Sequence, residues 1–112
     1  MKNPKFQIFK GKNDKFYFRL NARNGEQILS SQAYAAKAGC QNGIESVKKN
    51  APNSENFEVK EAANGKFHFN LLAVNKQVIA SSQMYATKQS CEGGIASVQN
   101  VAPEAGVEDT TA

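Results

Sequence analysis

Two cysteines and one histidine are the residues of this sequence whose types could support nucleophilic chemistry. Cys40 and Cys91 lie 51 residues apart, and His68 is the only histidine. A cysteine nucleophile needs a base within hydrogen-bond reach and an electropositive, partly exposed setting. Both cysteines instead fall at helical spacing with apolar residues, so we expect buried, inert thiols. Because no Gly-rich phosphate loop, metal-ligand cluster or recurring carboxylate pair accompanies them, we expect no enzyme, cofactor or metal site.

A repeated polar string, Ser-Ser-Gln-x-Tyr-Ala, is a second candidate site. Its hydroxyl and amide groups come from Ser30, Ser31, Gln32, Ser81, Ser82 and Gln83. These groups could line a ligand groove near an axis that relates the two copies. Alternatively, they satisfy backbone groups where a strand gives way to a helix, as serines often do at such junctions. We favour the structural interpretation, because two identical strings also follow from two identical folding requirements.

The elements that must position these residues occur twice in the chain. From residue 6 onward the two halves align without a gap over 47 positions, and about 22 of those positions are identical. We therefore predict one domain over residues 1–112, built from repeats of about 5–52 and 56–103 and ending in a short tail or edge strand. Two copies are too few for a solenoid, so we expect a closed pair related by a pseudo-twofold axis.

The hydrophobic pattern of each repeat predicts three short strands followed by an amphipathic helix. In the first copy the strands lie near residues 6–9, 16–21 and 28–30, and in the second copy near residues 57–60, 67–72 and 78–80. Apolar and polar residues alternate along the second strand, so one face packs on a core and the other points outward. After Tyr34 and Tyr85 the apolar spacing becomes helical. The predicted fold class is α+β, with two β-β-β-α repeats forming one antiparallel sheet and both helices packed on one face.

Three local features of the repeats lead to separate predictions. Asn64-Gly65 predicts a type I′ turn, because both residues tolerate the positive φ that this turn requires. Thr87 is a credible N-cap for the second helix, whereas Ala36, at the same place in the first repeat, cannot cap. Gly43 and its counterpart interrupt the helices, which indicates close packing against the sheet.

The outward face of the sheet is the third candidate site. It is expected to carry Tyr17, Arg19, Arg23, His68 and Asn70. Aromatic and guanidinium groups on an open sheet are typical of proteins that stack single-stranded nucleic acid. The same face is expected to hold Leu72 and Val74, and apolar patches with polar rims commonly mark protein contacts. Both kinds of partner are therefore compatible with this face.

Charge is distributed unevenly along the chain, whose net charge is +4. Residues 1–52 carry +7 and residues 53–112 carry −3. This asymmetry suits head-to-tail association or an anionic partner on one side, although scattered lysines also serve solubility alone. No apolar run approaches the roughly 18 residues of a membrane span, and no secretory signal is recognisable, so we expect a cytoplasmic protein.

With both repeats in view, the chain resembles the YegP-like family of small bacterial proteins of unknown function. The likeness is carried by residues 64–71 (NGKFHFNL), 81–87 (SSQMYAT) and 94–98 (GIASV). It implies that the two repeats share one antiparallel sheet and exchange C-terminal strands. The family has no established catalytic or binding residues that could be carried over. We therefore predict a non-catalytic interaction or self-association module with a protein partner, and single-stranded nucleic-acid binding as the alternative.

Overall fold

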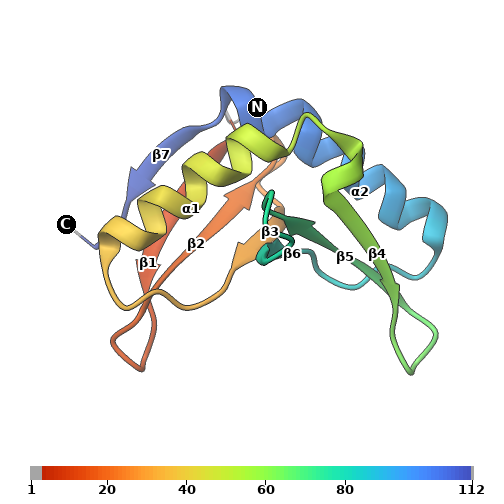
Figure 1. Cartoon of the computed structure of the whole chain (residues 1–112), viewed down its shortest axis with the longest axis horizontal. Helices are drawn as coiled ribbons and strands as arrows, with labels where there is room; N and C mark the ends of the chain where they lie inside the picture. The colour runs from red at the N-terminus through yellow and green to blue at the C-terminus, as the bar shows by residue number, and fades with distance from the viewer. Residues whose placement is uncertain (1–3, 112) are drawn as a thin grey trace.

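A seven-stranded sheet and two α-helices make up this protein in the computed structural model, which describes residues 4–111 (Figure 1). The first half contains β1 (Lys5–Lys10), β2 (Phe16–Asn21), β3 (Gln27–Ser31) and α1 (Lys37–Asn50). A short 3-10 helix, η1 (Ser54–Asn56), leads into the second half, which contains β4 (Phe57–Glu61), β5 (Phe67–Leu72), β6 (Val78–Ser81) and α2 (Lys88–Val101). A second 3-10 helix, η2 (Ala102–Glu104), is followed by β7 (Gly106–Asp109). The predicted α+β class and the predicted elements of both repeats are confirmed.

The order of the strands across the sheet is β4-β5-β6-β3-β2-β1-β7. The two repeats meet between β3 and β6, where Ser30 pairs with Ser81. Five neighbouring pairs are antiparallel, but β7 runs parallel to β1. The prediction of an entirely antiparallel sheet is therefore wrong, and the sheet is mixed. The physical reason is that β7 follows a helix rather than a hairpin, and only a hairpin forces its strands to be antiparallel.

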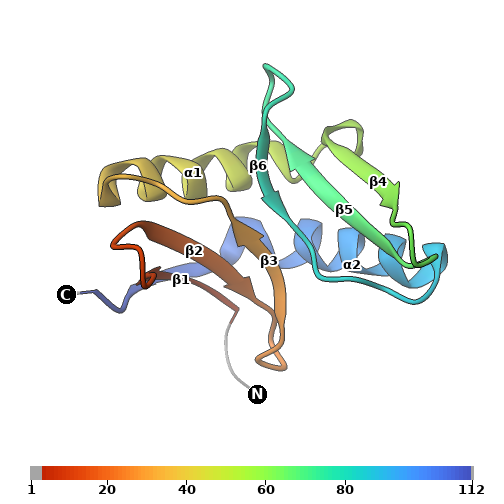
Figure 2. The same ribbon diagram turned by 90° about the horizontal axis from the view of Figure 1, so that it is seen from below.

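Both helices lie on the same side of the sheet, behind the strands when the molecule is seen from below (Figure 2). Helix α1 contacts β2 of its own repeat and β5 and β6 of the other, while α2 contacts β4 and β5 of its own repeat and β3 of the other. Each helix therefore covers strands of both repeats. The consequence is a single core that neither repeat contains alone.

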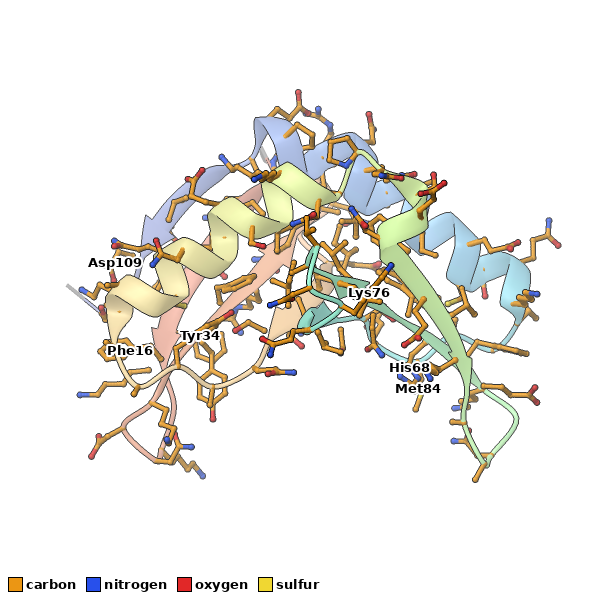
Figure 3. The ribbon with its side chains drawn as sticks, in the orientation of Figure 1. Phe16, Tyr34, His68, Lys76, Met84 and Asp109 are labelled. Carbon is orange, nitrogen blue, oxygen red and sulfur yellow. The ribbon has the colours of Figure 1, made fainter. Side chains whose placement is uncertain are left out.

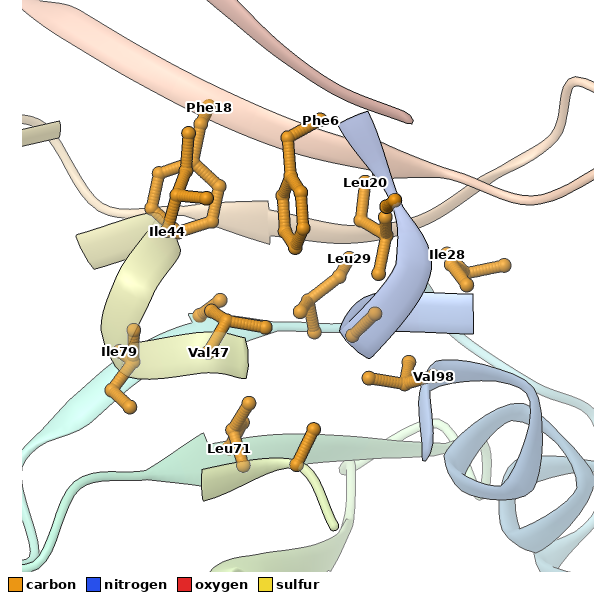
Figure 4. Packing of buried hydrophobic residues seen from close by; sticks show 14 of the residues in the cluster. Phe6, Phe18, Leu20, Ile28, Leu29, Ile44, Val47, Leu71, Ile79 and Val98 are labelled. Carbon is orange, nitrogen blue, oxygen red and sulfur yellow. The ribbon is translucent and has the colours of Figure 1, made fainter. Parts of the chain in front are cut away.

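The core lies between the helices and the sheet, and contains buried residues of both helices and of β1, β2, β3, β5 and β6, with Phe57 and Val59 of β4 packed against it (Figure 4). Its largest fully buried side chains include Phe6, Phe18, Leu20, Leu29, Ile44, Phe69 and Leu71. A break in the β2–β3 register after Leu20 lets Ile28 and Leu29, although adjacent in sequence, both be buried. The same break occurs between β5 and β6, so the bulge belongs to the repeat.

The four tight turns that join the strands share one construction. Each has an asparagine whose Oδ1 accepts a hydrogen bond from the backbone N–H two residues later; these are Asn13, Asn24, Asn64 and Asn75. The residue after each asparagine has a positive φ; these are Asp14 (62°), Gly25 (84°), Gly65 (81°) and Lys76 (70°). The type I′ prediction is therefore wrong, because Gly65 has positive φ and Asn64 does not. The Gly65 N–H bonds to the Ala62 carbonyl and the Ala62 N–H to the Lys66 carbonyl, so the turn is longer than a two-residue hairpin.

The two helices begin differently, as predicted from Thr87 and Ala36. The Thr87 side chain accepts a hydrogen bond from the Ser90 N–H at 3.1 Å, and the Thr87 N–H donates to the Ser90 hydroxyl at 3.3 Å. This reciprocal pair is a capping box. Ala36 makes no side-chain bond to the start of α1.

The helix glycines are packed against tyrosines that lie just before each helix. A Cβ added at Gly43 would lie 2.5 Å from the Tyr34 hydroxyl oxygen and 2.8 Å from the Phe18 ring. At Gly94 the added atom would collide with the Tyr85 hydroxyl in the same way. Close packing as the reason for these glycines is thus confirmed, and burial raises the pKa of both tyrosine hydroxyls.

Candidate binding face of the sheet

The side of the sheet opposite the helices, called here the outer face, brings Tyr17 and Arg19 together. The Tyr17 ring stacks on Phe9, with 5.6 Å between ring centroids and 16° between planes. The Arg19 guanidinium lies 4.6 Å from the centre of the Phe9 ring. Asn13 Nδ2 donates to the Tyr17 hydroxyl at 3.0 Å. The aromatic and cationic groups predicted for this face are therefore adjacent. Both already contact Phe9 of the same chain.

A polar network centred on Gln7 continues the outer face from β2 to β7. Gln7 Oε1 accepts hydrogen bonds from Arg19 Nε at 3.0 Å and from Asn21 Nδ2 at 2.9 Å. Gln7 Nε2 donates to Glu108 Oε1 at 2.6 Å, and Lys5 lies 3.3 Å from the same carboxylate. The hydrogen bond from Gln7 and the nearby Lys5 lower the pKa of Glu108. These contacts attach the C-terminal strand to the first repeat.

Ser30 of β3 and Ser81 of β6, the first serines of the two strings, lie at the centre of the sheet, where the two repeats meet. Ser30 lies opposite Ser81, and Ser81 Oγ donates to Asn70 Oδ1 at 2.7 Å. Asn70 in turn contacts Glu58 at 3.5 Å, and Lys60 lies 3.6 Å from Glu58. Asn70 therefore belongs to this face together with residues of β4.

The second serine of each string bonds to backbone groups. Ser31 Oγ accepts from the Phe18 N–H at 2.8 Å and donates to the Gln32 carbonyl at 2.8 Å. Ser82 repeats these bonds with the Phe69 N–H at 2.9 Å and the Gln83 carbonyl at 2.8 Å. The side chains of both glutamines are exposed. The bonds of the second serines agree with the structural interpretation.

Two residues expected on the outer face lie elsewhere. Arg23 is in the β2–β3 turn and forms an ion pair with Glu104 of η2. Val74 is in the β5–β6 turn, where it is 78% exposed. Both predictions are wrong because β2 ends at Asn21 and β5 ends at Leu72, so the alternation of faces does not extend to them.

His68 lies on β5, separated from Tyr17 on β2 by β6 and β3. In Figure 3 His68 and Met84 lie in one half of the molecule, and Phe16 and Tyr34 lie in the other. His68 is partly buried, pairs across the strands with Lys60, and has a buried Nδ1 with no hydrogen-bond partner in the described chain. The predicted face residues therefore form two separate groups, one on β2 and one on β5.

Both cysteines are fully buried, as predicted, on the sides of the helices that face the core. Burial raises the pKa of the Cys40 thiol to about 11 and raises that of Cys91 as well. A raised pKa reduces the thiolate fraction and therefore the reactivity of a cysteine. Within residues 4–111, no three side chains of the His, Cys, Asp and Glu types are grouped closely enough to bind a metal ion.

A less covered side of the second repeat was missed by reasoning from the sequence. Phe6, Ile8 and Ile44 are at most 1% exposed. Their counterparts 51 residues later, Phe57, Val59 and Ile95, are only partly buried. Strand β7 covers β1, whereas β4 is the last strand on its side of the sheet as far as residues 4–111 show. The sequence repeat could have revealed this difference. It predicts two equivalent first strands, β1 and β4, and one possible edge strand after the second repeat, β7.

These features define a class of protein: a tandem-repeat α+β protein whose two halves share one mixed sheet and one core. The chain belongs to the family described as "Domain of unknown function (DUF1508)", which matches it twice, at residues 12–58 and 62–109. Matches to proteins named YegP confirm the resemblance to the YegP-like family. The first match ends at residue 58, in β4, and the second ends at residue 109, in β7. In the family model, the strand that follows the helix is therefore β4 in the first match and β7 in the second.

Relatives and solved structures cover nearly the whole chain. It is 50% identical to UPF0339 protein PA0329 of Pseudomonas aeruginosa, over 94% of this chain and 96% of that protein. It is also 50% identical to UPF0339 protein YegP of Escherichia coli K12, over 95% and 96% of the two chains. The solution NMR structure of E. coli yegP, a protein of unknown function, matches with a TM-score of 0.91 at 47% identity, over 98% of this chain and 95% of that one. UPF0339 protein SO3888 of Shewanella oneidensis matches with a TM-score of 0.89 at 40% identity, over 96% and 91%.

Neither α1 nor α2, nor any other helix within residues 4–111, is long and apolar enough to cross a membrane.

Proposed function

We propose that this protein is a non-catalytic interaction module of the bacterial cytoplasm, which binds another protein chain along β4 and α2. The observation that carries the proposal is the unequal cover of equivalent strands. Phe6 and Ile8 of β1 are fully buried, while Phe57 and Val59 of β4 are partly exposed. A strand with an uncovered side presents N–H and C=O groups that another chain can pair with. Apolar side chains beside such groups favour a protein partner.

The proposal treats the two repeats as related by a pseudo-twofold axis between β3 and β6. The support for this axis is that Ser30 pairs with Ser81, and Ser81 occupies in the second repeat the position that Ser30 occupies in the first. Under that relation β4 is equivalent to β1. The surface beside β4 is then equivalent to the one on which β7 packs.

A capture experiment with tagged protein tests this function. We expect wild-type protein to retain a specific partner from cells that express it, and Val59→Lys to lose that partner, because a charge would enter the contact. Val74→Lys is the matched control, since Val74 is already 78% exposed in a distant turn. Equal capture by all three proteins, or capture of nothing specific, would contradict the proposal.

Single-stranded nucleic-acid binding through the outer face remains the alternative. A base that stacks on Tyr17 has to compete with Phe9, and a phosphate bound by Arg19 has to compete with Gln7. This prior engagement is why we favour the protein partner. Titration with single-stranded RNA at several salt concentrations separates the two, because phosphate contacts weaken as salt rises. Salt-dependent binding that is lost in Tyr17→Ala would establish the alternative in place of our proposal.

A further inference from the structure

The contacts that hold β7 against the first repeat show what a strand needs at this kind of position. The Ile8 carbonyl accepts hydrogen bonds from the Thr110 N–H at 3.0 Å and from the Thr110 hydroxyl at 2.6 Å. Lys37 Nζ, at the start of α1, lies 2.8 Å from Asp109 Oδ2. Figure 3 shows Asp109 beside this end of the helix. β7 is thus bound through backbone groups of β1 and through a lysine of the adjacent helix.

The helix α1 also provides a surface for the apolar residue of β7. Val107 lies at a recess of about 270 Å³ whose other lining residues are Gln41, Asn42, Ile44 and Glu45. Along the strand Val107 and Asp109 are on the same side, and Glu108 is on the other, where it meets Gln7. A strand bound here therefore presents an apolar and an acidic residue to the helix side, and one polar residue to the outer face.

The second repeat retains the same requirements beside β4. Lys88 stands at the place of Lys37, is exposed, and has no acidic side chain within 4 Å among the described residues. Ile95 stands at the place of Ile44 and is only partly buried. Gly93 and Ala96 replace the polar Asn42 and Glu45, and a Cβ added at Gly93 would meet no atom within 4 Å. This side of α2 is therefore more open around Ile95 than the side of α1 that receives Val107, and its one charged counterpart is Glu92, in the place of Gln41.

Charges differ at several places between the two positions: Glu58 replaces Gln7, Asn56 replaces Lys5, Glu92 replaces Gln41 and Ala96 replaces Glu45. The changes opposite Glu108 determine which strand fits. Gln7, which donates to Glu108, is replaced by Glu58 on β4. A strand with glutamate at this position would place two carboxylates opposite each other, which is destabilising. The β7 strand of a second copy is therefore a poor match, while a strand with a basic residue there is a good one.

We infer that β4 and α2 bind an extended segment of a different protein, parallel to β4, with an apolar, a basic and an acidic residue in succession. The apolar residue packs on Ile95 and Gly93, the basic residue faces Glu58, and the acidic residue binds Lys88. This inference rests on the proposed function and names the chemistry of its partner.

Synthetic peptides test the inference with the intact protein. The main peptide has the sequence of residues 105–111 with Glu108→Lys, and the comparison peptide keeps the native Glu108. NMR titration of labelled protein is suitable, because it locates weak binding residue by residue. We expect the main peptide to shift the signals of β4 and α2 selectively, and the native peptide to bind about tenfold more weakly because of Glu58.

A charge exchange at Lys88 provides the decisive arm. Lys88→Glu should weaken binding of the main peptide about tenfold, and a peptide that also carries Asp109→Lys should recover it. Lys12→Glu makes the same change of net charge in the β1–β2 turn, at the other edge of the sheet, and should leave binding unaffected. Equal binding of all peptides, unchanged binding in Lys88→Glu, or shifts on another face would each overturn the inference.

Three further outcomes distinguish this inference from the proposed function. If Val59→Lys abolishes partner capture but no peptide binds, the peptide chemistry is wrong and the proposed function stands. If sedimentation shows dimers of the native chain that Val59→Lys dissociates, the occupant is a second copy and the inference of a foreign segment is wrong. If neither capture nor peptide binding responds to changes on β4, both proposals fail.

Discussion

The strands β1 and β4 are equivalent in the two repeats but have different surroundings. β1 lies between β2 and β7, and its Phe6 and Ile8 are fully buried. β4 has β5 on one side and no described strand on the other, and its Phe57 and Val59 are partly exposed. The difference comes from connectivity, because the segment after α1 continues directly into β4 while the segment after α2 is free to pair with β1. Within residues 4–111, the two equivalent strands β1 and β4 therefore share one covering strand, β7.

The same comparison explains how polar residues are used at the two positions. Beside β1, Lys37 pairs with Asp109 and Gln7 pairs with Glu108. Beside β4, the second repeat has Lys88 at the position of Lys37, and its side chain is exposed. Lys88 is more informative than other surface lysines, because its counterpart Lys37 shows that a lysine at this position can bind an acidic residue of an added strand.

The largest expected difference between the two strands concerns their apolar residues. Ile8→Ala should lower the free energy of unfolding by about 3 kcal/mol, because it leaves a cavity at a fully buried site. Val59→Ala should lower it by only about 1 kcal/mol, since a partly exposed side chain loses less burial. Urea unfolding of both variants measures this. Equal losses would show that β4 is covered in solution as well as β1 is.

Adjacent glycines of α2 should respond in opposite directions. Gly94→Ala should destabilise the protein by about 2 kcal/mol, because the new methyl group collides with the Tyr85 hydroxyl. Gly93→Ala should stabilise it by up to about 1 kcal/mol, because the site beside β4 is open and alanine favours the helix. Thermal unfolding of the two variants gives the signs directly. A loss of stability in Gly93→Ala would mean that the surface beside β4 is more crowded than the structure shows.

The starts of the two helices offer a third comparison. Thr87→Ala should lower the free energy of unfolding by about 1 kcal/mol, because it removes the capping box with Ser90. Ala36→Thr should raise it, by a similar or smaller amount, since α1 has no side-chain cap. Chemical denaturation checks both variants. If Ala36→Thr is neutral, the contact between Lys37 and Asp109 already fixes the start of α1.

The smallest expected effect is a local loosening of β7 in acid. Hydrogen bonds from Lys37 and Thr111 lower the pKa of Asp109 to about 2. A carboxylate with a lowered pKa stabilises the folded state above its unfolded pKa of about 3.9, and this stabilisation is lost as the pH falls towards the folded value. NMR signals of β7 and β1 should therefore change between about pH 4 and pH 2, while those of β4 do not follow Asp109. Asp109→Asn is the control: it should remove the change near Lys37 and leave only the change that Glu108, whose pKa is also lowered, causes near Gln7.

Most of the fold could be predicted from the sequence, because it follows from local periodicity. Alternation along β2 and helical spacing after Tyr34 depend on residues a few positions apart, and the gapless repeat supported each prediction twice. Errors appeared where the alternation ended or where the connection mattered. Arg23 and Val74 lie beyond the ends of their strands, and the type I′ prediction failed because the turn at Gly65 is longer.

The candidate site could be predicted only in part, because it combines residues from strands that are not neighbours in sequence. The pairing of Tyr17 with Arg19 follows from their spacing on one strand, and the structure adds Phe9 from β1 between them. The sequence could not show that two strands, β6 and β3, separate His68 from this group, because strand order depends on which strands of the two repeats pair.

The sequence by itself determined the duplication, the elements of each repeat, the buried cysteines and the two kinds of helix start. These properties depend on side-chain type and short-range spacing. Only the tertiary structure decided that β3 joins β6, that β7 runs parallel to β1, and that β4 is the outermost strand among residues 4–111. The reason is physical: both repeats have nearly the same local pattern, so their difference arises from how one connected chain can close a shared core.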